Sequence, residues 1–387
     1  MKCRICNSFK TYEAFNLGKQ PLANKYLKTF KKNQIKYDLK LYFDTKSKLV
    51  SISKRIPSKI MFNNKYPYRS SMSVTMQNSF KKVSILIKKK FKPKLLLEIG
   101  SNDGALLKNF NKKNVIGIEP CKNLANITKK LGYKTISNYW NSKTVSFFLK
   151  KNQKVDLIYS SNTLTHISDL NDVFKSIDTL LTKNGILIIE DPSLLECLKK
   201  TSYDQFYNEH IYVFSALAVE NILKKFDLEI FDIKNLKIHG GSLRYFIKRK
   251  KNKKFKVKNT VTKQLKAEIS FGLKKYSTYK RFSVKSSKSK KDLLKLIKKL
   301  KTNNNIIGYG ATAKAVTVLN YCKINENLID AFVDTTLDKQ NKYMPGTKIK
   351  ILKYSKNIIL KANYLFLGAW NFKNEILKKE KTFIKKG

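Results

Sequence analysis

The stretch LLLEIGSNDGALL, residues 95–107, runs from an apolar strand through a turn of small residues into an expected helix. Such a turn lets the backbone close on a ligand at the carboxyl end of a strand in a nucleotide-binding α/β sheet. A second strand, NVIGIEP (114–120), ends in Glu119, where an acid can accept hydrogen bonds from both ribose hydroxyls. The turn carries Glu98 and Asp103 and lacks GxGxxG spacing, so it suits a cationic ligand without phosphate.

Further apolar strands and helical segments alternate on both sides of this turn. The strands VDLIYSS (155–161) and GILIIED (185–191) continue a parallel α/β pattern, and 228–236 and 243–250 are expected to turn antiparallel. A second α/β unit starts with NNIIGYGATAKAVTVLNY (304–321). We expect four units, at residues 1–60, 61–250, 251–302 (a Lys-rich helical connector) and 303–387.

Composition points to a globular enzyme in a reducing compartment. The chain has 387 residues, 42% of them hydrophobic, which favours two or three domains. Five cysteines are an odd number and argue against a disulfide framework. No apolar run is long enough for a membrane helix and the start resembles no secretory signal, so we expect a cytoplasmic protein without membrane insertion.

The formal charge of +54 is extreme, with 81 Lys and Arg against 27 Asp and Glu. The lysines lie along the whole chain, whereas a nucleic-acid footprint should be clustered, so no nucleic-acid partner is expected. The field would still favour an anionic small-molecule substrate.

The chain has only three histidines, at 166, 210 and 239. Imidazole is the side chain that titrates near neutrality and is the usual proton carrier, although a lone histidine is more often structural. Tyr207 and Glu209 stand next to His210, which makes a base, an acid and a phenol in four residues. Methylation of a carbon beside a ketone needs such groups, because a proton must leave that carbon and the enolate oxygen must be stabilised.

The glycine turn and Glu119 resemble the first two motifs of class I methyltransferases, which bind S-adenosylmethionine. EIGSNDG, GIEP, SSNTLTHISDLNDVF, YNEHIYVFS, HGGSLR, GYGATAKAVTVLNYC, the PGT at 345–347 and GAWNF resemble, in order and spacing, the C-methyltransferases that act on nucleotide-linked deoxy keto-sugars. The resemblance covers almost the whole chain. It implies an α/β fold with a Rossmann-like methyltransferase sheet, a small zinc-ribbon-like amino-terminal β domain and a second Rossmann-like domain at the carboxyl end.

The resemblance also implies roles for individual residues. His210 is the expected base, with Tyr207, Glu209, His166 and Tyr68 as the other catalytic groups; Tyr66 is the alternative to Tyr68. The expected cofactor-binding residues are Glu98, Gly100, Asn102, Asp103, Gly104, Glu119 and Asn162. His239, Ser242, Arg244 and Lys314 are expected at the sugar or phosphate side. The resemblance and the size make a monomer or weak oligomer plausible.

The amino-terminal metal site departs from the family pattern. The family has a second CxxC in a hairpin after the first, but here Asp44 and Ser47 fall where those cysteines would be. Cys3, Cys6 and Asp44 remain as candidate zinc ligands, and serine rarely binds zinc. The sequence therefore leaves zinc open as a second cofactor.

Two alternatives remain. The turn at Gly308, Gly310 and Ala313, with Asp334 as the acid, could suggest a dinucleotide site, but phosphate or sugar-nucleotide contact through the turn and Lys314 ranks above it, because the resemblance assigns the cofactor to the first sheet. A purely structural turn is as compatible with the sequence as phosphate contact. The chain could also methylate oxygen or nitrogen of another small molecule or a nucleic acid, or be a non-catalytic binding relative.

Overall fold

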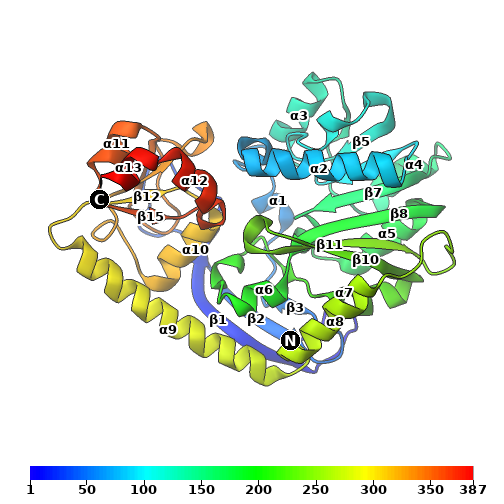
Figure 1. Ribbon diagram of the computed structural model, residues 1–387, viewed down its shortest axis with the longest axis horizontal. Coiled ribbons are helices and arrows are strands. Elements are labelled where there is room, and N and C mark those ends of the chain that lie inside the picture. The colour runs from blue at the N-terminus through cyan, green and yellow to red at the C-terminus, as the bar shows by residue number, and fades with distance from the viewer. Residues whose placement is uncertain (387) are drawn as a thin grey trace.

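The computed structural model describes residues 1–386, which form three sheets joined by helices (Figure 1). The central sheet has the order β10-β11-β8-β7-β4-β5-β6, in which β8, β7, β4, β5 and β6 run parallel and β10 and β11 antiparallel. Its strands are β4 (Leu96–Ile99), β5 (Val115–Ile118), β6 (Lys134–Ile136), β7 (Val155–Ser161), β8 (Leu181–Pro192), β10 (Leu228–Leu236) and β11 (Ser242–Arg249). This is the expected Rossmann-like methyltransferase sheet with an antiparallel end.

Side chains of the central strands alternate between two apolar layers. Leu96 packs with Phe80 and Val83 of α2 (Val74–Lys90) on one face, whereas Leu97 belongs to the core on the other face. The second face is covered by α4 (Ser142–Leu149) and α5 (Leu170–Leu180). The other helices of this unit are α1 (Ser58–Met61), α3 (Lys122–Lys130), α6 (Leu194–Lys199) and α7 (Ala216–Leu223). Because successive residues of a strand point to opposite faces, a continuous apolar run such as LLLEI serves a sheet covered on both sides.

The sequence predicts a helix directly after the glycine turn, and this prediction is wrong. Only a short 3₁₀ turn, Leu107–Asn109, follows Gly104. The side-chain amide of Asn109 donates to the carbonyls of Ala105 and Leu106, and this takes acceptors that a longer helix would use for its own amides.

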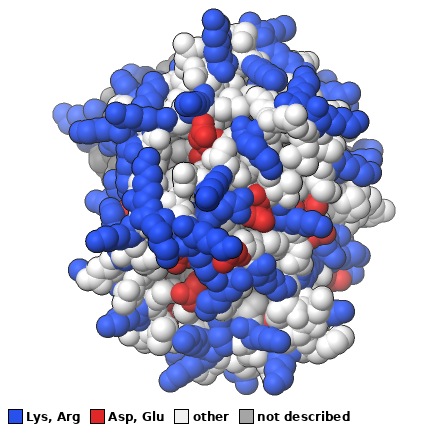
Figure 2. All heavy atoms as spheres, turned by 90° about the vertical axis from the view of Figure 1, so that its right-hand side faces the viewer, with Lys and Arg blue, Asp and Glu red and all other residues white. Residues whose placement is uncertain are grey.

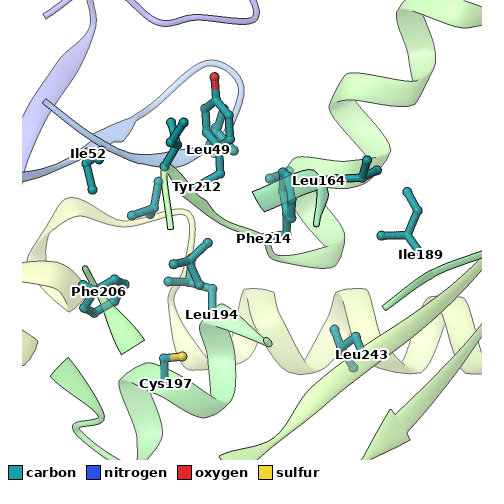
Figure 3. Close-up of a cluster of buried hydrophobic side chains, with 14 of the residues drawn as sticks. Leu49, Ile52, Leu164, Ile189, Leu194, Cys197, Phe206, Tyr212, Phe214 and Leu243 are labelled. Atoms are coloured by element: carbon teal, nitrogen blue, oxygen red, sulfur yellow. The ribbon is translucent and has the colours of Figure 1, made fainter. Parts of the chain in front are cut away.

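The amino-terminal sheet contains a strand from a distant part of the chain. Its order is β1 (Thr11–Pro21), β2 (Lys36–Asp44), β3 (Val50–Ile52) and β9 (Tyr212–Val213). The hairpin of β2 and β3 confirms the alternation in residues 39–53. Val50 pairs with Val213, and the core between the two sheets is continuous around Leu49, Tyr212 and Phe214 (Figure 3). The small β unit is therefore fused to the central one, and the expected boundary at residue 60 stays a prediction.

The carboxyl-terminal unit is a smaller parallel sheet of order β14-β13-β12-β15, as expected for a second Rossmann-like domain. Its elements are β12 (Ile306–Tyr309), α10 (Ala313–Cys322), β13 (Ala331–Asp334), β14 (Lys350–Lys353), α11 (Lys356–Lys361), β15 (Tyr364–Leu367), α12 (Lys373–Lys379) and α13 (Lys381–Lys385). Two helices, α8 (Asn259–Phe271) and α9 (Tyr276–Lys301), form the connector, and α9 runs from the central unit to this sheet (Figure 1).

The lysines are spread over the surface. The face shown in Figure 2 carries Lys and Arg over its whole extent, with acidic side chains scattered between them. This agrees with the expectation of solvated lysines rather than one focused patch. Within residues 1–386, no helix combines the length and hydropathy that a membrane crossing requires.

Arg244, expected near the substrate, instead forms an ion pair inside the central sheet. Its Nε contacts Oε1 of Glu190, its neighbour across β11 and β8, and the two side chains are 4% and 2% exposed. Breaking a buried pair leaves one charge uncompensated, whereas replacing both partners by apolar groups is often nearly neutral.

Arg244→Met should therefore lower the free energy of unfolding by about 3–5 kcal/mol, and adding Glu190→Leu should recover most of that loss. Denaturant titration measures both. Lys250→Met is the matched control, because the pair of Lys250 with Asp227 is exposed and should change stability by less than about 1 kcal/mol. An Arg244→Met protein of normal stability that has lost ligand binding would support the role expected from the sequence.

Candidate active site

A cavity of about 750 Å³ lies between the carboxyl ends of the central strands and the carboxyl-terminal unit. Parallel strands bring their carboxyl ends to one edge, so turns that are far apart in sequence meet there. The cavity is lined by eleven of the expected catalytic, cofactor-binding and substrate-binding residues: Glu98, Gly100, Asn102, Glu119, Asn162, His166, Tyr207, His210, Tyr68, His239 and Lys314. Tyr66, the alternative to Tyr68, lines it as well.

Five other expected site residues do not line this cavity. Asp103 accepts hydrogen bonds from the hydroxyls of Ser70 and Ser71, and Arg244 is paired with Glu190. The hydroxyl of Ser242 donates to the carbonyl of Ile238 at 3.2 Å. Gly104 and Glu209 also lie outside the cavity lining. The structure therefore places these residues outside the cavity lining, and their expected ligand contacts stay predictions.

The glycine turn is held in shape by Glu119. Its two carboxylate oxygens accept hydrogen bonds from the backbone amides of Asn102 at 2.9 Å and Cys121 at 2.8 Å. Gly100 has φ +75°, and a Cβ there would collide with the side chain of Thr163, so the turn requires glycine at this position.

Glu98 presents an unusual charge environment. It is 3% exposed, and its Oε2 is buried without a hydrogen-bond partner. Burial, with Glu119 and Asp103 nearby, raises the pKa of Glu98 well above its usual range. A bound cation would favour the ionised form and offset this burial.

His210 forms the centre of a hydrogen-bonded chain. Its Nδ1 lies 2.7 Å from the carbonyl oxygen of Gln205, and its Nε2 lies 2.6 Å from the hydroxyl of Tyr207. Because a carbonyl only accepts, Nδ1 carries the proton, and Nε2 accepts from Tyr207. Burial lowers the pKa of His210 well below its usual range, so the ring is neutral and Nε2 keeps its lone pair.

His166 stacks between Phe62 and His210, with ring centroids 5.3 and 5.2 Å away. Its Nε2 is buried and has no hydrogen-bond partner. Burial lowers the pKa of His166 to about 3, so this ring is neutral too. His166 therefore places its buried Nε2, which has no hydrogen-bond partner within residues 1–386, beside the hydrogen-bonded chain of His210.

Glu209 lies one layer behind this cluster. Its oxygens accept from Asn24 at 2.8 Å and from the hydroxyl of Tyr66 at 2.9 Å. Tyr66 rather than Tyr68 thus contacts the acidic member of the cluster, and Tyr68 lies in the cavity lining. Burial raises the pKa of Glu209 to about 7.

The opposite wall comes from the second glycine turn and α10. Lys314 is 8% exposed, its Nζ donates to the carbonyl of His239 at 3.2 Å, and it forms no ion pair within residues 1–386. Its Nζ also lies 5.0 Å from the ring centre of Trp370. A buried cation without a carboxylate partner is suited to an anionic ligand.

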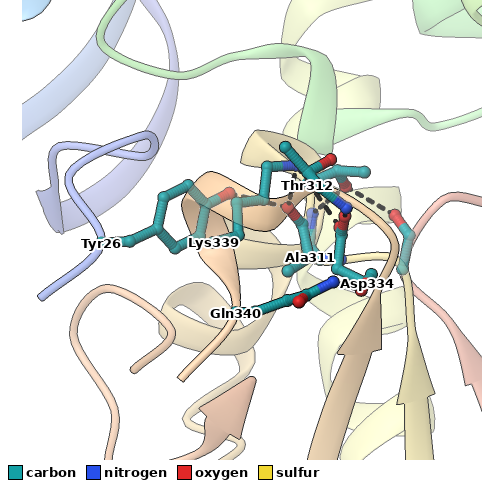
Figure 4. A network of polar contacts seen from close by, with 9 residues as sticks. Tyr26, Ala311, Thr312, Asp334, Lys339 and Gln340 are labelled. Carbon is teal, nitrogen blue, oxygen red and sulfur yellow. Dashed lines mark hydrogen bonds and ion pairs between the residues drawn. The ribbon is translucent and has the colours of Figure 1, made fainter. Parts of the chain in front are cut away.

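Asp334, the acid of the possible dinucleotide site, is already engaged (Figure 4). Its oxygens accept from the amides of Ala311 and Thr336, both at 2.8 Å, and Lys339 lies 3.4 Å away. Tyr26 and Lys339 both donate to the carbonyl of Ala311. These bonds hold the second glycine turn in shape, as those of Glu119 hold the first, and Asp334 also lines the cavity, so the dinucleotide alternative stays a prediction.

The amino-terminal ligands meet as expected. Donor atoms of Cys3, Cys6 and Asp44 all lie within 4.8 Å of one another. Oδ1 of Asp44 accepts from the hydroxyl of Ser47 at 2.7 Å, while its Oδ2 is buried without a partner. Ser47 Oγ lies 3.3 Å from the sulfur of Cys3. The three donors fit a zinc ion that keeps a fourth, weaker ligand.

Two polar groups near the site were not predicted from the sequence. Gln205 lines the cavity, and Trp370 donates to Asp204 at 2.5 Å across the two units. Gln205 lies just before the YNEH motif and Trp370 lies within GAWNF, but the side chains of Gln205 and Trp370 do not titrate. Their roles depend on contacts that the sequence pattern does not encode.

Comparison with known proteins gives three family matches along the chain. Residues 3–62 match a proposed zinc binding domain, 68–233 a methyltransferase domain, and 237–387 the C-methyltransferase C-terminal domain. The C-methyltransferase NovU of Streptomyces niveus is 25% identical over 393 residues, covering 100% of this chain and 93% of the relative.

Two solved structures each match less than half of this chain. An S-adenosylmethionine-dependent methyltransferase from Clostridium acetobutylicum has 16% identity and a TM-score of 0.34, covering 45% of this chain and 92% of its own. Magnesium protoporphyrin IX methyltransferase from Synechocystis has 14% identity and a TM-score of 0.35, covering 46% and 84%.

A cysteine at position 47 should strengthen zinc binding. Ser47→Cys supplies a third thiolate next to Cys3 and Asp44, so zinc affinity should rise at least about tenfold over the unmodified chain. Competition with a chromophoric chelator measures this. Ser51→Cys, a buried serine of β3, is the control and should change nothing. Equal affinities for the unmodified chain and Ser47→Cys would show that position 47 does not face the ion.

Glu209 should make stability depend on pH. Its pKa is about 7 when folded and about 4.5 when unfolded, so the native state binds more protons between these values. The contribution of Glu209 to the free energy of unfolding, roughly 3 kcal/mol, is therefore present below pH 4.5 and is lost as the pH rises through 7. Unfolding titrations at several pH values should show a loss that is larger by this amount in the unmodified chain than in Glu209→Gln, because other buried carboxyl groups with raised pKa values, such as Glu98, titrate in both proteins. Parallel pH profiles of the two proteins would contradict it.

Proposed function

The chain belongs to the S-adenosylmethionine-dependent C-methyltransferases, and from this premise we propose that it methylates a carbon beside the ketone of a nucleotide-linked keto-deoxysugar. The observation that carries the proposal is the hydrogen-bonded chain of Tyr207, His210 and Gln205. It stands in one cavity with the glycine turn and the buried Lys314. Methylation of oxygen or nitrogen would need a base but no group for an enolate.

The turn at Glu98 is proposed to hold the cofactor. When bound, S-adenosylmethionine supplies an electrophilic methyl group on a positively charged sulfur. Glu98, with its unpartnered oxygen and raised pKa, suits a positive charge. Gly100, Asn102, Glu119 and Asn162 are the other proposed contacts, whereas Asp103 and Gly104 shape the turn from behind. Zinc, if held by Cys3, Cys6 and Asp44, would act as a structural ion.

Proton removal is proposed to run through Tyr207 to His210. Both nitrogens of His210 already have partners, so its free lone pair reaches substrate only through the phenol. The phenol oxygen takes the proton from carbon as its own proton passes to Nε2 of His210. The products are an enolate, a phenol and an imidazolium, and the charges balance. Glu209 then acts by positioning Tyr66 rather than by touching substrate.

Roles for the other polar groups are proposed from the hydrogen-bond or ion-pair partners that they lack within residues 1–386. His166 would donate its unpartnered Nε2–H to the enolate oxygen. Lys314 would face the diphosphate of the substrate, with His239 beside it. Ser242 and Arg244 are left with supporting roles.

Deuterium exchange tests this proposal. Nucleotide-linked 4-keto-deoxysugars incubated in heavy water should exchange the hydrogen beside the ketone and gain a methyl group when cofactor is added. His210→Asn and Tyr207→Phe should each slow exchange by about 10²–10⁴-fold, because each interrupts the same proton path. Cofactor affinity, measured by calorimetry, should stay unchanged in both variants.

Two outcomes would contradict parts of this proposal. Normal exchange in Tyr207→Phe would return the role of direct base to His210. Cofactor binding without exchange in any sugar would refute the substrate class.

A further inference from the structure

Gln205 is buried in the wall of the cavity, next to the proposed base. It is 2% exposed and lies in the lining with Tyr207, His210 and His239. Its side-chain Nε2 donates to the carbonyl of His239 at 2.5 Å. Because a carbonyl cannot donate, the amide orientation is fixed, and Oε1 is the free end. That oxygen is buried and has no hydrogen-bond partner among residues 1–386.

The main chain of the same residue orients His210. The carbonyl of Gln205 accepts the Nδ1 proton of His210 at 2.7 Å and so leaves Nε2 as the acceptor. A ligand group that contacts Oε1 of Gln205 is therefore held beside the proton path.

Gln20 is a second buried glutamine, and it differs from Gln205 in its position relative to the cavity. Gln20 is 3% exposed, donates to the carbonyl of Leu17 at 2.9 Å and also has an unpartnered Oε1. Gln20 does not line the cavity, so no ligand can reach it there. Gln205 differs in belonging to the residues that line the cavity. Polar atoms left unpaired in a closed site disfavour binding, and a ligand that supplies the missing donor avoids this cost.

We propose that Gln205 is a specificity-determining residue, whose Oε1 accepts a hydrogen bond from a hydroxyl or amino group on the substrate ring. This rests on the proposed function, since it assigns one contact of that substrate. Substrates without the donor leave Oε1 unpaired and are rejected. His210 and Tyr207 keep their geometry, because the main chain of Gln205 provides it.

The test compares Gln205→Met with Gln20→Met, its matched control. Each protein is given a thymidine diphosphate-linked 4-keto-6-deoxyhexose and analogues that each lack one ring hydroxyl. Values of kcat/KM and rates of deuterium exchange are measured. For one analogue, the unmodified protein should lose about 10–100-fold in kcat/KM relative to the parent sugar. Gln205→Met should show that loss already with the parent and no further loss with that analogue. Gln20→Met should discriminate as the unmodified protein does.

The outcomes distinguish a failure of the role proposed for Gln205 from a failure of the proposed function. If Gln205→Met lowers kcat/KM by one common factor for the parent and every analogue, its role is structural and the specificity assignment is overturned. A weaker cofactor affinity in Gln205→Met, with unchanged sugar discrimination, would show that Oε1 pairs with the cofactor and would also overturn it. If the unmodified protein exchanges no sugar, the proposed function fails and the assignment of Gln205 fails with it.

Discussion

The hydrogen bond from Nδ1 of His210 to the carbonyl of Gln205 depends on a segment that is anchored to the carboxyl-terminal unit and to the amino-terminal sheet. The hydroxyl of Tyr203 lies 3.5 Å from the sulfur of Cys322, at the end of α10 in the carboxyl-terminal unit. Two residues after His210, β9 joins the amino-terminal sheet through Tyr212 and Val213. The segment therefore carries the proposed proton path between two anchored ends, which limits how far His210 can move.

This arrangement gives the amino-terminal unit a function besides metal binding. Pairing of β3 with β9 fixes the chain just after His210, and Phe206, Tyr212 and Phe214 contribute to the core beneath it (Figure 3). Asn24, from the same unit, donates to Glu209. Loss of a ligand from the zinc site is compatible with an intact cavity, because packing and strand pairing also hold this unit in place.

The surface carries mostly basic side chains, whereas the cavity combines buried acidic side chains on one wall with a buried lysine on the other. The chain carries a formal charge of +54, yet buried acids gather at the carboxyl edge of the central sheet. Glu190 is neutralised by Arg244, whereas Glu98 has no such partner. On the facing wall, Lys314 is buried without an ion pair. One cavity thus offers a place for a cationic group and a place for an anionic one, which matches a sulfonium cofactor and a nucleotide-linked substrate.

The sequence by itself determined the sheet class, the antiparallel end of the central sheet and part of the cavity lining. Apolar runs that end in small or acidic residues mark strand ends, and a parallel sheet must bring those ends to one edge. Tertiary structure decided which side chains face the ligand. Arg244 and Glu209 have competent chemistry but point to partners far away in sequence, Glu190 and Tyr66, and no local pattern encodes such contacts. Gln205 was found only because its free oxygen is buried at the cavity, and both burial and the lack of a partner are properties of the folded chain.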